Sequence, residues 1–427
     1  MKVSADISKI NGEVFAPTSK SYTHRAIAIG ALSNECIVKK PLLSADTLAT
    51  VSACKKLGAK IEKMNGDLHI IGMEGKPGVP DDIIDVKNSG TTLRLMTAIS
   101  SLANGSTVLT GDHSIRGRPN QPLLDVLNKM NVEVFSTRNN GCAPIVVRGG
   151  LKGSAVEIDG SMSSQFVSAL LIACPLAMED TILSISGEMK SRPYVDITIE
   201  MLAEAGVKVI VDETNGIKFI IPANQKYNLK EYTVPGDFSS ASYLLAAAAM
   251  LGSSITVHNL FPSKQGDSEI INVLRQMGAD VHWNTQKGVV IVKGKTLKAI
   301  TFDAGATPDL VPTVAVLAAV ADGVTVICNA KHVRYKETDR LHAMAVELSK
   351  MGIIVQEKPD SLIITGGKLT GADVHGWHDH RIVMSLTLAG IVAGNTTIDT
   401  AESVSISYPN FFDDMSFLGA KIEKLDE

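Results

Sequence analysis

The chain has 427 residues and a formal net charge of −4 at pH 7, with 45% hydrophobic, 20% charged and 4% aromatic residues. This mildly acidic balance gives no sign of a nucleic-acid-binding protein. The most apolar runs, 246–251 and 314–320, are cut short by Gly, Pro or Asp well before the roughly 20 residues that a membrane span requires. The start of the chain shows no basic segment followed by an apolar one, so we expect no export signal and a cytoplasmic location.

Along the chain, six polar stretches each lead into an apolar segment of small residues, with a period of about 70 residues. We expect helices over 25–33, 94–104, 166–178, 240–252, 311–322 and 381–395. Because these segments are apolar on nearly all sides, the helices are predicted to be buried. The unpaired N–H groups and the positive dipole end make each helix start a candidate anion site.

A second, amphipathic helix follows each apolar one and closes on Gly, or once on Asn, before a strand. The closing residues are Gly58, Asn131, Gly206, Gly278, Gly352 and Gly419. A residue just past a helix end often adopts the left-handed conformation, which Gly and Asn tolerate best. Each repeat unit is therefore predicted to contain two helices and three or four short strands.

Six such units divide naturally into three plus three. A single core does not usually grow past about 250 to 300 residues, so we predict an α/β protein with two lobes. The chain is expected to cross between them near 232–236, where Pro235 and Gly236 interrupt the pattern. An open solenoid is the alternative reading of a repeat, and the all-round apolar helices argue against it.

Arginines recur at equivalent places in the repeat. Arg25, Arg94 and Arg381 are each expected in the first turn of an apolar helix, where a cation opposes the helix dipole. A single such Arg is adequately explained by a surface carboxylate, but three in three repeats are harder to explain that way. Further cations lie at Lys20, Arg118 and Arg340. Together they favour a small polyanionic ligand with carboxylate or phosphate groups.

Two carboxylates stand near these cations. In Lys336-Glu337-Thr338-Asp339-Arg340, capping of the following helix explains the acids but leaves the two cations unexplained. A carboxylate between two anion-holding cations is useful for proton transfer, so Glu337 is a candidate acid–base residue. Asp309 follows Pro308 at another helix start, where an Asp is most often only a cap.

The sequence gives little sign of a cofactor. Neither Gly-x-x-x-x-Gly-Lys-Ser/Thr nor Gly-x-Gly-x-x-Gly occurs, so we expect no nucleotide cofactor. His375, His378 and His380 with Asp379 have a metal-like spacing but lack a matching partner cluster, and we expect no metal. Five scattered cysteines without a Cys-x-x-Cys pair indicate neither a disulfide framework nor a thiolate metal site.

Eight short motifs, in this order, resemble those of the 5-enolpyruvylshikimate-3-phosphate synthase family over essentially the whole chain. They are Lys20-Ser21 with Arg25, Asn88-Ser89-Gly90-Thr91 with Arg94, Arg118-Pro119, Ser163-Ser164-Gln165, Ser191-Arg192-Pro193-Tyr194, Pro308-Asp309, Lys336-Glu337-Thr338-Asp339-Arg340 and Asp379-His380-Arg381. The resemblance implies two similar lobes, each of three βαβαββ units around buried parallel helices, joined by a two-strand hinge. Residues 15–234 would form one lobe and residues 1–14 plus 235–427 the other, with the active site in the cleft between them.

The resemblance also implies an activity. It is transfer of the enolpyruvyl group of phosphoenolpyruvate to the 5-hydroxyl of shikimate 3-phosphate, with release of phosphate through a tetrahedral intermediate. Asp309 would be the base, Glu337 the proton donor and acceptor at the enol methylene, and His380 and Lys20 assisting groups. Shikimate 3-phosphate is expected at Lys20, Ser21, Arg25, Ser163, Ser164, Gln165, Ser191, Asp309 and Lys336. Phosphoenolpyruvate is expected at Lys20, Gly90, Arg94, Arg118, Gln165, Arg340 and Arg381. No cofactor is implied, and we expect a monomer.

One position departs from the family pattern. Many members carry Lys at the phosphoenolpyruvate site where this chain has Ile406, and no other lysine lies between 369 and 420. Two alternatives stay open. The related UDP-N-acetylglucosamine enolpyruvyl transferase carries a mobile-loop Cys, which the stretch 111–119 lacks. A non-catalytic anion-binding protein would explain the arginines but not Asp309 and Glu337 beside them. Glyphosate, which occupies the phosphoenolpyruvate site in this family, is expected to find room at Gly90.

Overall fold

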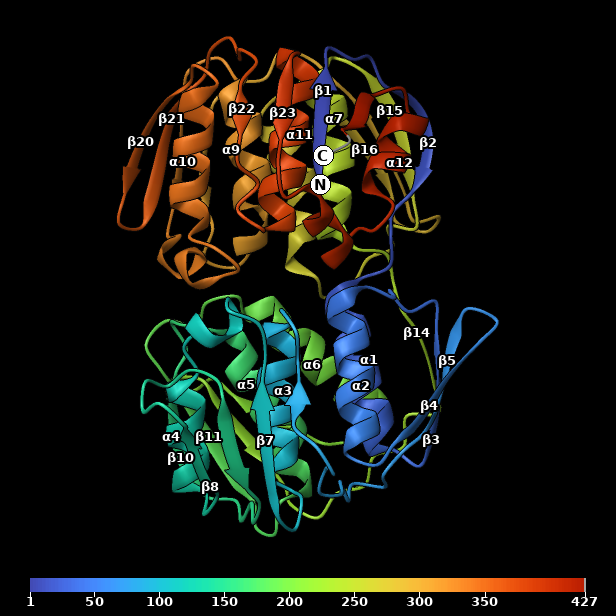
Figure 1. Ribbon diagram of the computed structural model, residues 1–427, viewed down its shortest axis with the longest axis vertical. Coiled ribbons are helices and arrows are strands. Elements are labelled where there is room, and N and C mark those ends of the chain that lie inside the picture. The colour runs from blue at the N-terminus through green and yellow to red at the C-terminus, as the bar shows by residue number, and fades with distance from the viewer. Residues whose placement is uncertain (426–427) are drawn as a thin grey trace. The chain divides into compact units, whose positions relative to one another are not determined.

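A computed structural model describes residues 1–425 and divides the chain into two compact units (Figure 1). Unit 1 comprises Met1–Ser19 and the residues from Pro235 onward, and unit 2 comprises Lys20–Val234. Each unit has its own hydrophobic core. Residues 15–19 lie in unit 1, whereas the expected boundary falls at residue 15. The backbone explains this, since Ser19 N donates to the carbonyl of Pro235 at 2.8 Å.

Unit 2 contains six α-helices and twelve strands. The helices are α1 (Lys20–Leu32), α2 (Ala45–Lys56), α3 (Gly90–Ser100), α4 (Gln121–Lys129), α5 (Ser164–Ala173) and α6 (Arg192–Glu204). The strands are β3 (Glu35–Lys39), β4 (Lys60–Met64), β5 (Asp67–Ile71), β6 (Ile84–Asp85), β7 (Ser106–Thr110), β8 (Glu133–Ser136), β9 (Ile145–Arg148), β10 (Ala155–Asp159), β11 (Thr181–Ser186), β12 (Ile210–Asp212), β13 (Lys218–Ile221) and β14 (Glu231–Thr233). Short 3₁₀ turns are η1 (Ile115–Gly117) and η2 (Cys174–Leu176).

The described part of unit 1 repeats this content. Its helices are α7 (Phe238–Met250), α8 (Ile270–Gln276), α9 (Val311–Ala319), α10 (Arg340–Lys350), α11 (His380–Ala393) and α12 (Phe411–Phe417). Its strands are β1 (Lys2–Asp6), β2 (Asn11–Phe15), β15 (Ser254–His258), β16 (Asp280–Asn284), β17 (Val289–Lys293), β18 (Thr301–Asp303), β19 (Val324–Cys328), β20 (Ile354–Lys358), β21 (Ser361–Thr365), β22 (Asp373–Val374), β23 (Thr396–Ile398) and β24 (Lys421–Leu425). The 3₁₀ turns are η3 (Gly266–Glu269), η4 (Pro308–Leu310), η5 (Lys331–Tyr335) and η6 (Ala401–Ile406).

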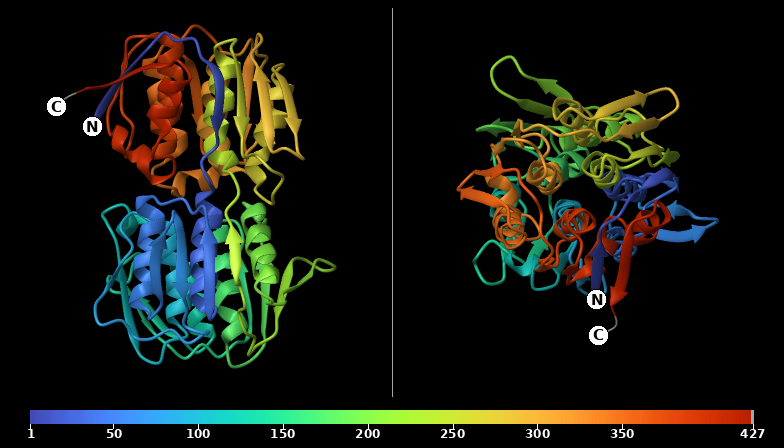
Figure 2. Two further views of the ribbon diagram at one scale, coloured as in Figure 1. Left: turned by 90° about the vertical axis from the view of Figure 1, so that its right-hand side faces the viewer. Right: turned by 90° about the horizontal axis from the view of Figure 1, so that it is seen from above.

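The strands form six four-stranded sheets of one design, in which a parallel pair is extended by two antiparallel strands. In β6-α3-β7-α4-β8-β9 the unit is continuous in sequence, as the expected βαβαββ pattern requires. Three sheets instead borrow a strand from elsewhere in the chain. β14 joins the sheet of β3, β2 joins that of β15, and β1 lies between β23 and β24. In both views of Figure 2 the first strand, in dark blue, runs beside the last one, in red.

The apolar helices are buried as predicted. In α7 every residue from Phe238 to Ala249 is buried, and α7, α9 and α11 pack against one another inside unit 1 (Figure 1). Runs of Ala allow close approach between helices, which brings apolar surface together with few gaps. The helices α3 and α5 of unit 2 are also almost entirely buried, and they pack against each other. No helix in the described part of the chain is long and apolar enough to cross a membrane.

The amphipathic helices end as the sequence predicts. All six closing residues have positive φ, from 67° at Asn131 to 116° at Gly58. Each is followed by an antiparallel strand, as β4 follows α2 and β8 follows α4. At five of the six positions the left-handed residue turns the chain from the helix into a hairpin, and at Gly419 it leads into β24, which pairs with β1.

Two expectations about helix starts were wrong. Arg25 and Arg94 do not lie in first turns, because α1 begins at Lys20 and α3 at Gly90. The helices extend into the polar stretches that were expected to precede them. In α3 the Ser89 side chain caps the helix by accepting from the backbone N–H of Thr92. Arg381, the second residue of α11, does lie in a first turn.

Candidate functional site

The charged residues singled out from the sequence gather into buried groups within each unit. In unit 1 they form the Asp309 cluster: Asp309, Lys336, Glu337, Arg340, Asp379, His380 and Arg381. Three starts of helical segments bring them together, since Asp309 lies in η4, Arg340 opens α10 and His380 opens α11. α9, α10 and α11 pack against one another, so residues about 30 to 70 positions apart meet at one end of the helices.

Arg340 is the central cation of the Asp309 cluster. Its side chain is 1% exposed and contacts three carboxylates. Nε and Nη2 donate to Asp379 at 2.7 and 3.2 Å, Nη1 donates to Asp309 at 2.9 Å, and Nη2 donates to Glu337 at 2.7 Å. Burial alone would lower the pKa of Arg340, but Asp379, Glu337 and Asp309 raise it above its usual value. The guanidinium is therefore permanently charged, and it holds the carboxylates in fixed places.

Asp309 is shared between two guanidiniums. Oδ1 accepts from Arg340 Nη1 at 2.9 Å and Oδ2 accepts from Arg381 Nη2 at 2.8 Å, with Lys336 Nζ 3.7 Å away. Burial raises the pKa of Asp309, but Arg381, Lys336 and Arg340 outweigh it and hold that pKa well below its usual range. Asp309 is not the cap of α9, since the N-cap position is Leu310 and no side-chain cap bond forms there. The capping interpretation of this residue is therefore wrong.

Asp379 binds two groups, the first turn of α11 and the side chain of Arg340. Its Oδ1 accepts from the backbone N–H of Arg381 at 2.8 Å, which makes it the N-cap of the helix. His380 Nδ1 lies 3.7 Å from the same carboxylate, and the His380 side chain is buried. One carboxylate thus fixes both the cation at the start of α10 and the first turn of α11.

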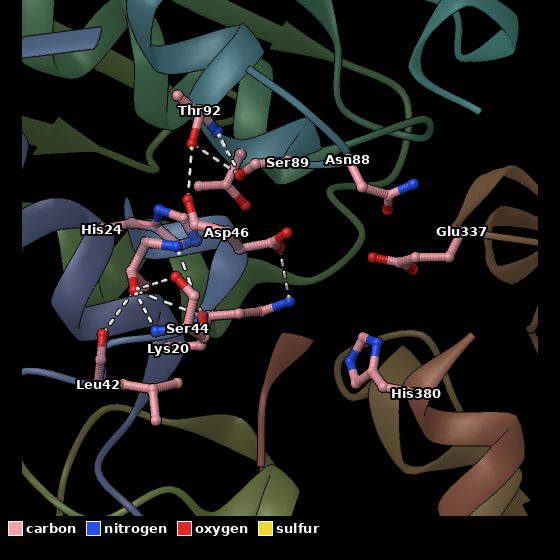
Figure 3. Close-up of polar contacts among 12 residues, drawn as sticks. Lys20, His24, Leu42, Ser44, Asp46, Asn88, Ser89, Thr92, Glu337 and His380 are labelled. Atoms are coloured by element: carbon pink, nitrogen blue, oxygen red, sulfur yellow. Dashed lines mark hydrogen bonds and ion pairs between the residues drawn. The ribbon is translucent and has the colours of Figure 1, made fainter. Parts of the chain in front are cut away.

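In unit 2, Lys20 and Asp46 form an ion pair at the starts of two neighbouring helices (Figure 3). Lys20 Nζ lies 3.2 Å from Asp46 Oδ2, and both side chains are largely buried. Ser44 caps α2 in a capping box with Thr47, which fixes the first turn that carries Asp46. The buried carboxylate of Asp46 therefore orients the side chain of Lys20, which is the first residue of α1.

Arg25 is held by residues of other helices in unit 2. Nε donates to Thr198 Oγ1 at 2.7 Å, and Nη2 donates to Ser168 Oγ at 3.2 Å and to the carbonyl of Tyr194 at 2.9 Å. Nη1 donates to the carbonyl of Ser21 at 2.9 Å. Burial lowers the pKa of Arg25 to about 10, which still leaves the side chain charged at neutral pH. Arg25 thus ties α1 to α5 and α6.

Arg94 and Arg118 converge on Gly90. A Cβ built on Gly90 would lie 2.5 Å from Arg94 Nη1 and 2.9 Å from Arg118 Nη1. Gln165 Oε1 accepts from Arg94 Nη1 at 2.8 Å, and Gln165 Nε2 donates to Thr91 Oγ1 at 3.0 Å. The absence of a side chain at Gly90 therefore allows two guanidiniums to approach the start of α3.

Three serines of the expected set lie at helix starts in unit 2. Ser163 caps α5 by accepting from the backbone N–H of Gln165 at 3.3 Å, and Ser164 is the first residue of that helix. Ser191 precedes α6 with a left-handed backbone at φ 54°, a costly conformation for a residue with a side chain. Such a strained residue at a helix start is a candidate for function rather than for stability.

Several partners of these side chains were not predicted as site residues from the sequence. They are Asp46, Asn120, Ser168, Thr198 and Asp379. Asp379 had a usable signal, because it stands directly before His380 and Arg381. Thr198 had none, since it is 173 positions from Arg25. No group of three or more His, Cys, Asp or Glu side chains within residues 1–425 is arranged as a metal site.

The fold is shared with solved structures of EPSP synthase from Acinetobacter baumannii. One has a TM-score of 0.82 at 30% sequence identity and covers 99% of this chain and 100% of its own. Another has a TM-score of 0.83 at 29% identity, with 100% of both chains covered. Fold and buried charge clusters together define an enzyme of the EPSP synthase class, and not an open solenoid.

Sequence comparison gives the family directly. The profile of the family described as EPSP synthase (3-phosphoshikimate 1-carboxyvinyltransferase) matches residues 5–415. Relatives named 3-phosphoshikimate 1-carboxyvinyltransferase include one from Methanosarcina acetivorans, 67% identical with 100% of both chains covered. Another, from Methanococcoides burtonii, is 65% identical with 99% of both chains covered. The chain belongs to the EPSP synthase family and is a transferase.

Proposed function

We propose that this chain transfers the enolpyruvyl group of phosphoenolpyruvate to the 5-hydroxyl of shikimate 3-phosphate and releases phosphate. The observation that carries the proposal is the Asp309 cluster. In it Arg340 and Arg381 both donate to Asp309, and Arg340 also donates to a second carboxylate, Glu337. Such a cluster supplies cations for an anionic substrate and carboxylates for moving protons.

The reaction divides into an addition and an elimination. In the addition, the 5-hydroxyl oxygen bonds to C2 of phosphoenolpyruvate, its proton passes to Asp309, and the C3 methylene takes a proton from Glu337. In the elimination, the bond from C2 to the phosphate oxygen breaks and Glu337 takes a proton back from the C3 methyl group. Asp309 returns its proton to the departing phosphate, so that protons balance over the cycle.

Asp309 becomes a better base when phosphoenolpyruvate binds. Its low pKa depends on Arg381, Lys336 and Arg340. We propose Arg381 and Arg340 as ligands of the substrate carboxylate. A carboxylate that binds these guanidiniums partly neutralises them, and the pKa of Asp309 then rises toward that of an ordinary Asp. Substrate binding is thereby coupled to activation of the base.

We propose that residues of both units bind the substrates. Shikimate 3-phosphate is assigned to Lys20, Ser21, Arg25, Ser163, Ser164, Gln165, Ser191, Asp309 and Lys336. Phosphoenolpyruvate is assigned to Lys20, Gly90, Arg94, Arg118, Gln165, Arg340 and Arg381, with His380 as an assisting polar group. The convergence of Arg94 and Arg118 on Gly90 supports the second assignment, because two nearby guanidiniums suit a multiply charged phosphate.

A phosphate-release assay with two acceptors tests the proposal. With phosphoenolpyruvate present, we expect release with shikimate 3-phosphate and none with UDP-N-acetylglucosamine. Release only with the second acceptor would establish the related transferase, and binding of phosphoenolpyruvate without release would establish an anion-binding protein.

We further propose a cytoplasmic monomer. The proposed substrates carry charges that prevent them from crossing a membrane unaided, and one chain supplies all the assigned residues. Cell fractionation and size-exclusion chromatography at assay concentration test these two points.

A further inference from the structure

Asn120 stands between the two arginines that converge on Gly90. It follows Arg118 and Pro119 and occupies the N-cap position of α4. Asn at this position usually caps the helix with its side chain, but here no side-chain cap bond forms. The residue is 1% exposed, so its amide is committed to contacts inside unit 2.

The Asn120 amide binds the side chain of Arg94 with one atom and the backbone of Arg118 with the other. Oδ1 accepts from Arg94 Nε at 3.1 Å, and Nδ2 donates to the backbone carbonyl of Arg118 at 2.9 Å. The site therefore requires a side chain with an acceptor facing Arg94 and a donor facing the carbonyl of Arg118. An Asp would keep the first bond and place an anionic oxygen against the carbonyl, while a Leu would lose both bonds.

The contact to Nε controls where the guanidinium of Arg94 points. Gln165 Oε1 accepts from Nη1 at 2.8 Å, and the guanidinium carbon lies 5.6 Å from the centre of the Phe166 ring. Arg118 is oriented similarly, since its Nη2 donates to Asn88 Oδ1 at 3.1 Å. These amides are neutral, so they orient the guanidiniums without cancelling their charge.

Two guanidiniums held at one place repel each other until an anion binds between them. Fixing them in advance lowers the conformational cost of binding that anion. We propose that Asn120 is a positioning residue that fixes the guanidinium of Arg94, and holds the backbone at Arg118, for the phosphate of phosphoenolpyruvate. This inference rests on the proposed function for the identity of the substrate, and on the contacts above for the arginine pair.

The test compares Asn120→Asp and Asn120→Leu with Asn128→Ala. Asn128 lies in the same helix and also makes side-chain bonds, donating to the carbonyl of Val134 at 2.8 Å and accepting from its N–H at 3.2 Å. It therefore controls for a general loss of packing around α4. Steady-state kinetics and thermal denaturation are measured for each variant.

We expect the KM for phosphoenolpyruvate to rise about tenfold in both Asn120 variants, with the KM for shikimate 3-phosphate within about twofold of the wild type. Asn128→Ala should leave both constants nearly unchanged, whatever its melting temperature. Because Asn120 makes no cap bond, Asn120→Asp tests the loss of the donor at Nδ2 together with the added charge beside Arg94. The Leu variant separates loss of positioning from added negative charge, because Asp would also form an ion pair with Arg94. If the Leu variant does not fold, unchanged kinetics in the Asp variant would still overturn the inference.

Binding of inorganic phosphate, measured by calorimetry, separates failure of this inference from failure of the proposed function. We expect weaker phosphate binding in Asn120→Asp than in the wild type and in Asn128→Ala. If the wild type does not turn over shikimate 3-phosphate, the proposed function fails while the phosphate result still tests the arginine pair. Unchanged phosphate binding and an unchanged KM in Asn120→Asp would overturn the inference.

Discussion

Asp309 Oδ2 accepts a hydrogen bond from Arg381 Nη2 at 2.8 Å, so the proposed base and a proposed substrate-binding cation neutralise each other. The opposite oxygen is bound to Arg340. If phosphoenolpyruvate binds where we propose, its carboxylate shares both guanidiniums with Asp309. In the proposed mechanism, this arrangement keeps Asp309 a weak base until the substrate carboxylate partly neutralises the two guanidiniums.

Asp309→Asn should retain affinity for shikimate 3-phosphate and lose turnover. The amide keeps part of the hydrogen bonding but does not accept a proton, and loss of a general base costs about 10² to 10⁴-fold in rate. Steady-state kinetics with both substrates varied measure the effect. If kcat is unchanged, Asp309 is not the base.

The same variant should show a pH-dependent loss of stability. Breaking a buried ion pair by removing one partner lowers the free energy of unfolding by about 3 to 5 kcal/mol. The Asp309→Asn variant should therefore have a melting temperature well below that of the wild type at pH 7. The pKa of Asp309 is held low in the folded protein, so its contribution is fully present above the unfolded value of about 3.9. It is then lost as the pH falls toward the folded pKa. Thermal denaturation from pH 7 to pH 3 should show the difference shrinking only below about pH 4.

Gly90→Ala should weaken glyphosate more than phosphoenolpyruvate. The new Cβ would lie 2.5 Å from Arg94 Nη1 and 2.9 Å from Arg118 Nη1, so both side chains must shift. A modest rise in the KM for phosphoenolpyruvate is expected from this shift, and a larger rise in the inhibition constant for glyphosate. Equal weakening of both would contradict a steric effect directed at the inhibitor.

Ile406→Lys should strengthen binding of phosphoenolpyruvate. Ile406 is the last residue of η6 and is only partly buried, so an ammonium can replace its methyl groups without entering the core. A charge-assisted contact contributes about 1.5 to 3 kcal/mol, which corresponds to roughly tenfold or more in affinity. We expect a lower KM for phosphoenolpyruvate and an unchanged one for shikimate 3-phosphate. If neither constant moves in a folded variant, position 406 does not face the substrate.

Replacement of all five cysteines by Ser or Ala should leave the chemistry intact. Burial raises the pKa of Cys36, Cys54 and Cys174 to about 12, so these thiols are not nucleophiles at neutral pH. Turnover per folded molecule, corrected by thermal denaturation, is the measurement. Selective loss of turnover in a folded variant would point to cysteine chemistry of the kind used by the related transferase.

The sequence by itself determined the repeat and its elements. Helix closure at Asn131 and Gly206, for example, depends on the φ preference of one residue, and burial of α7 depends on its composition of small and apolar residues without a charged side chain. Both are local properties that survive in any tertiary arrangement. Helix starts were less certain, as Arg94 shows, because Ser, Thr and Gly fit a cap, a first turn or a loop.

Only the tertiary structure decided which charges meet. Arg25 could have faced any acceptor, and its partner Thr198 lies 173 positions away on another helix. Likewise Asp379 binds Arg340 across 39 positions, and no feature of the sequence named Arg340 as its partner. The physical reason is that an ion pair or buried hydrogen bond requires two groups within about 3 Å, and that distance is set by the packing of whole helices. The type of a residue tells which charge its side chain has, but it does not tell which side chain that charge contacts.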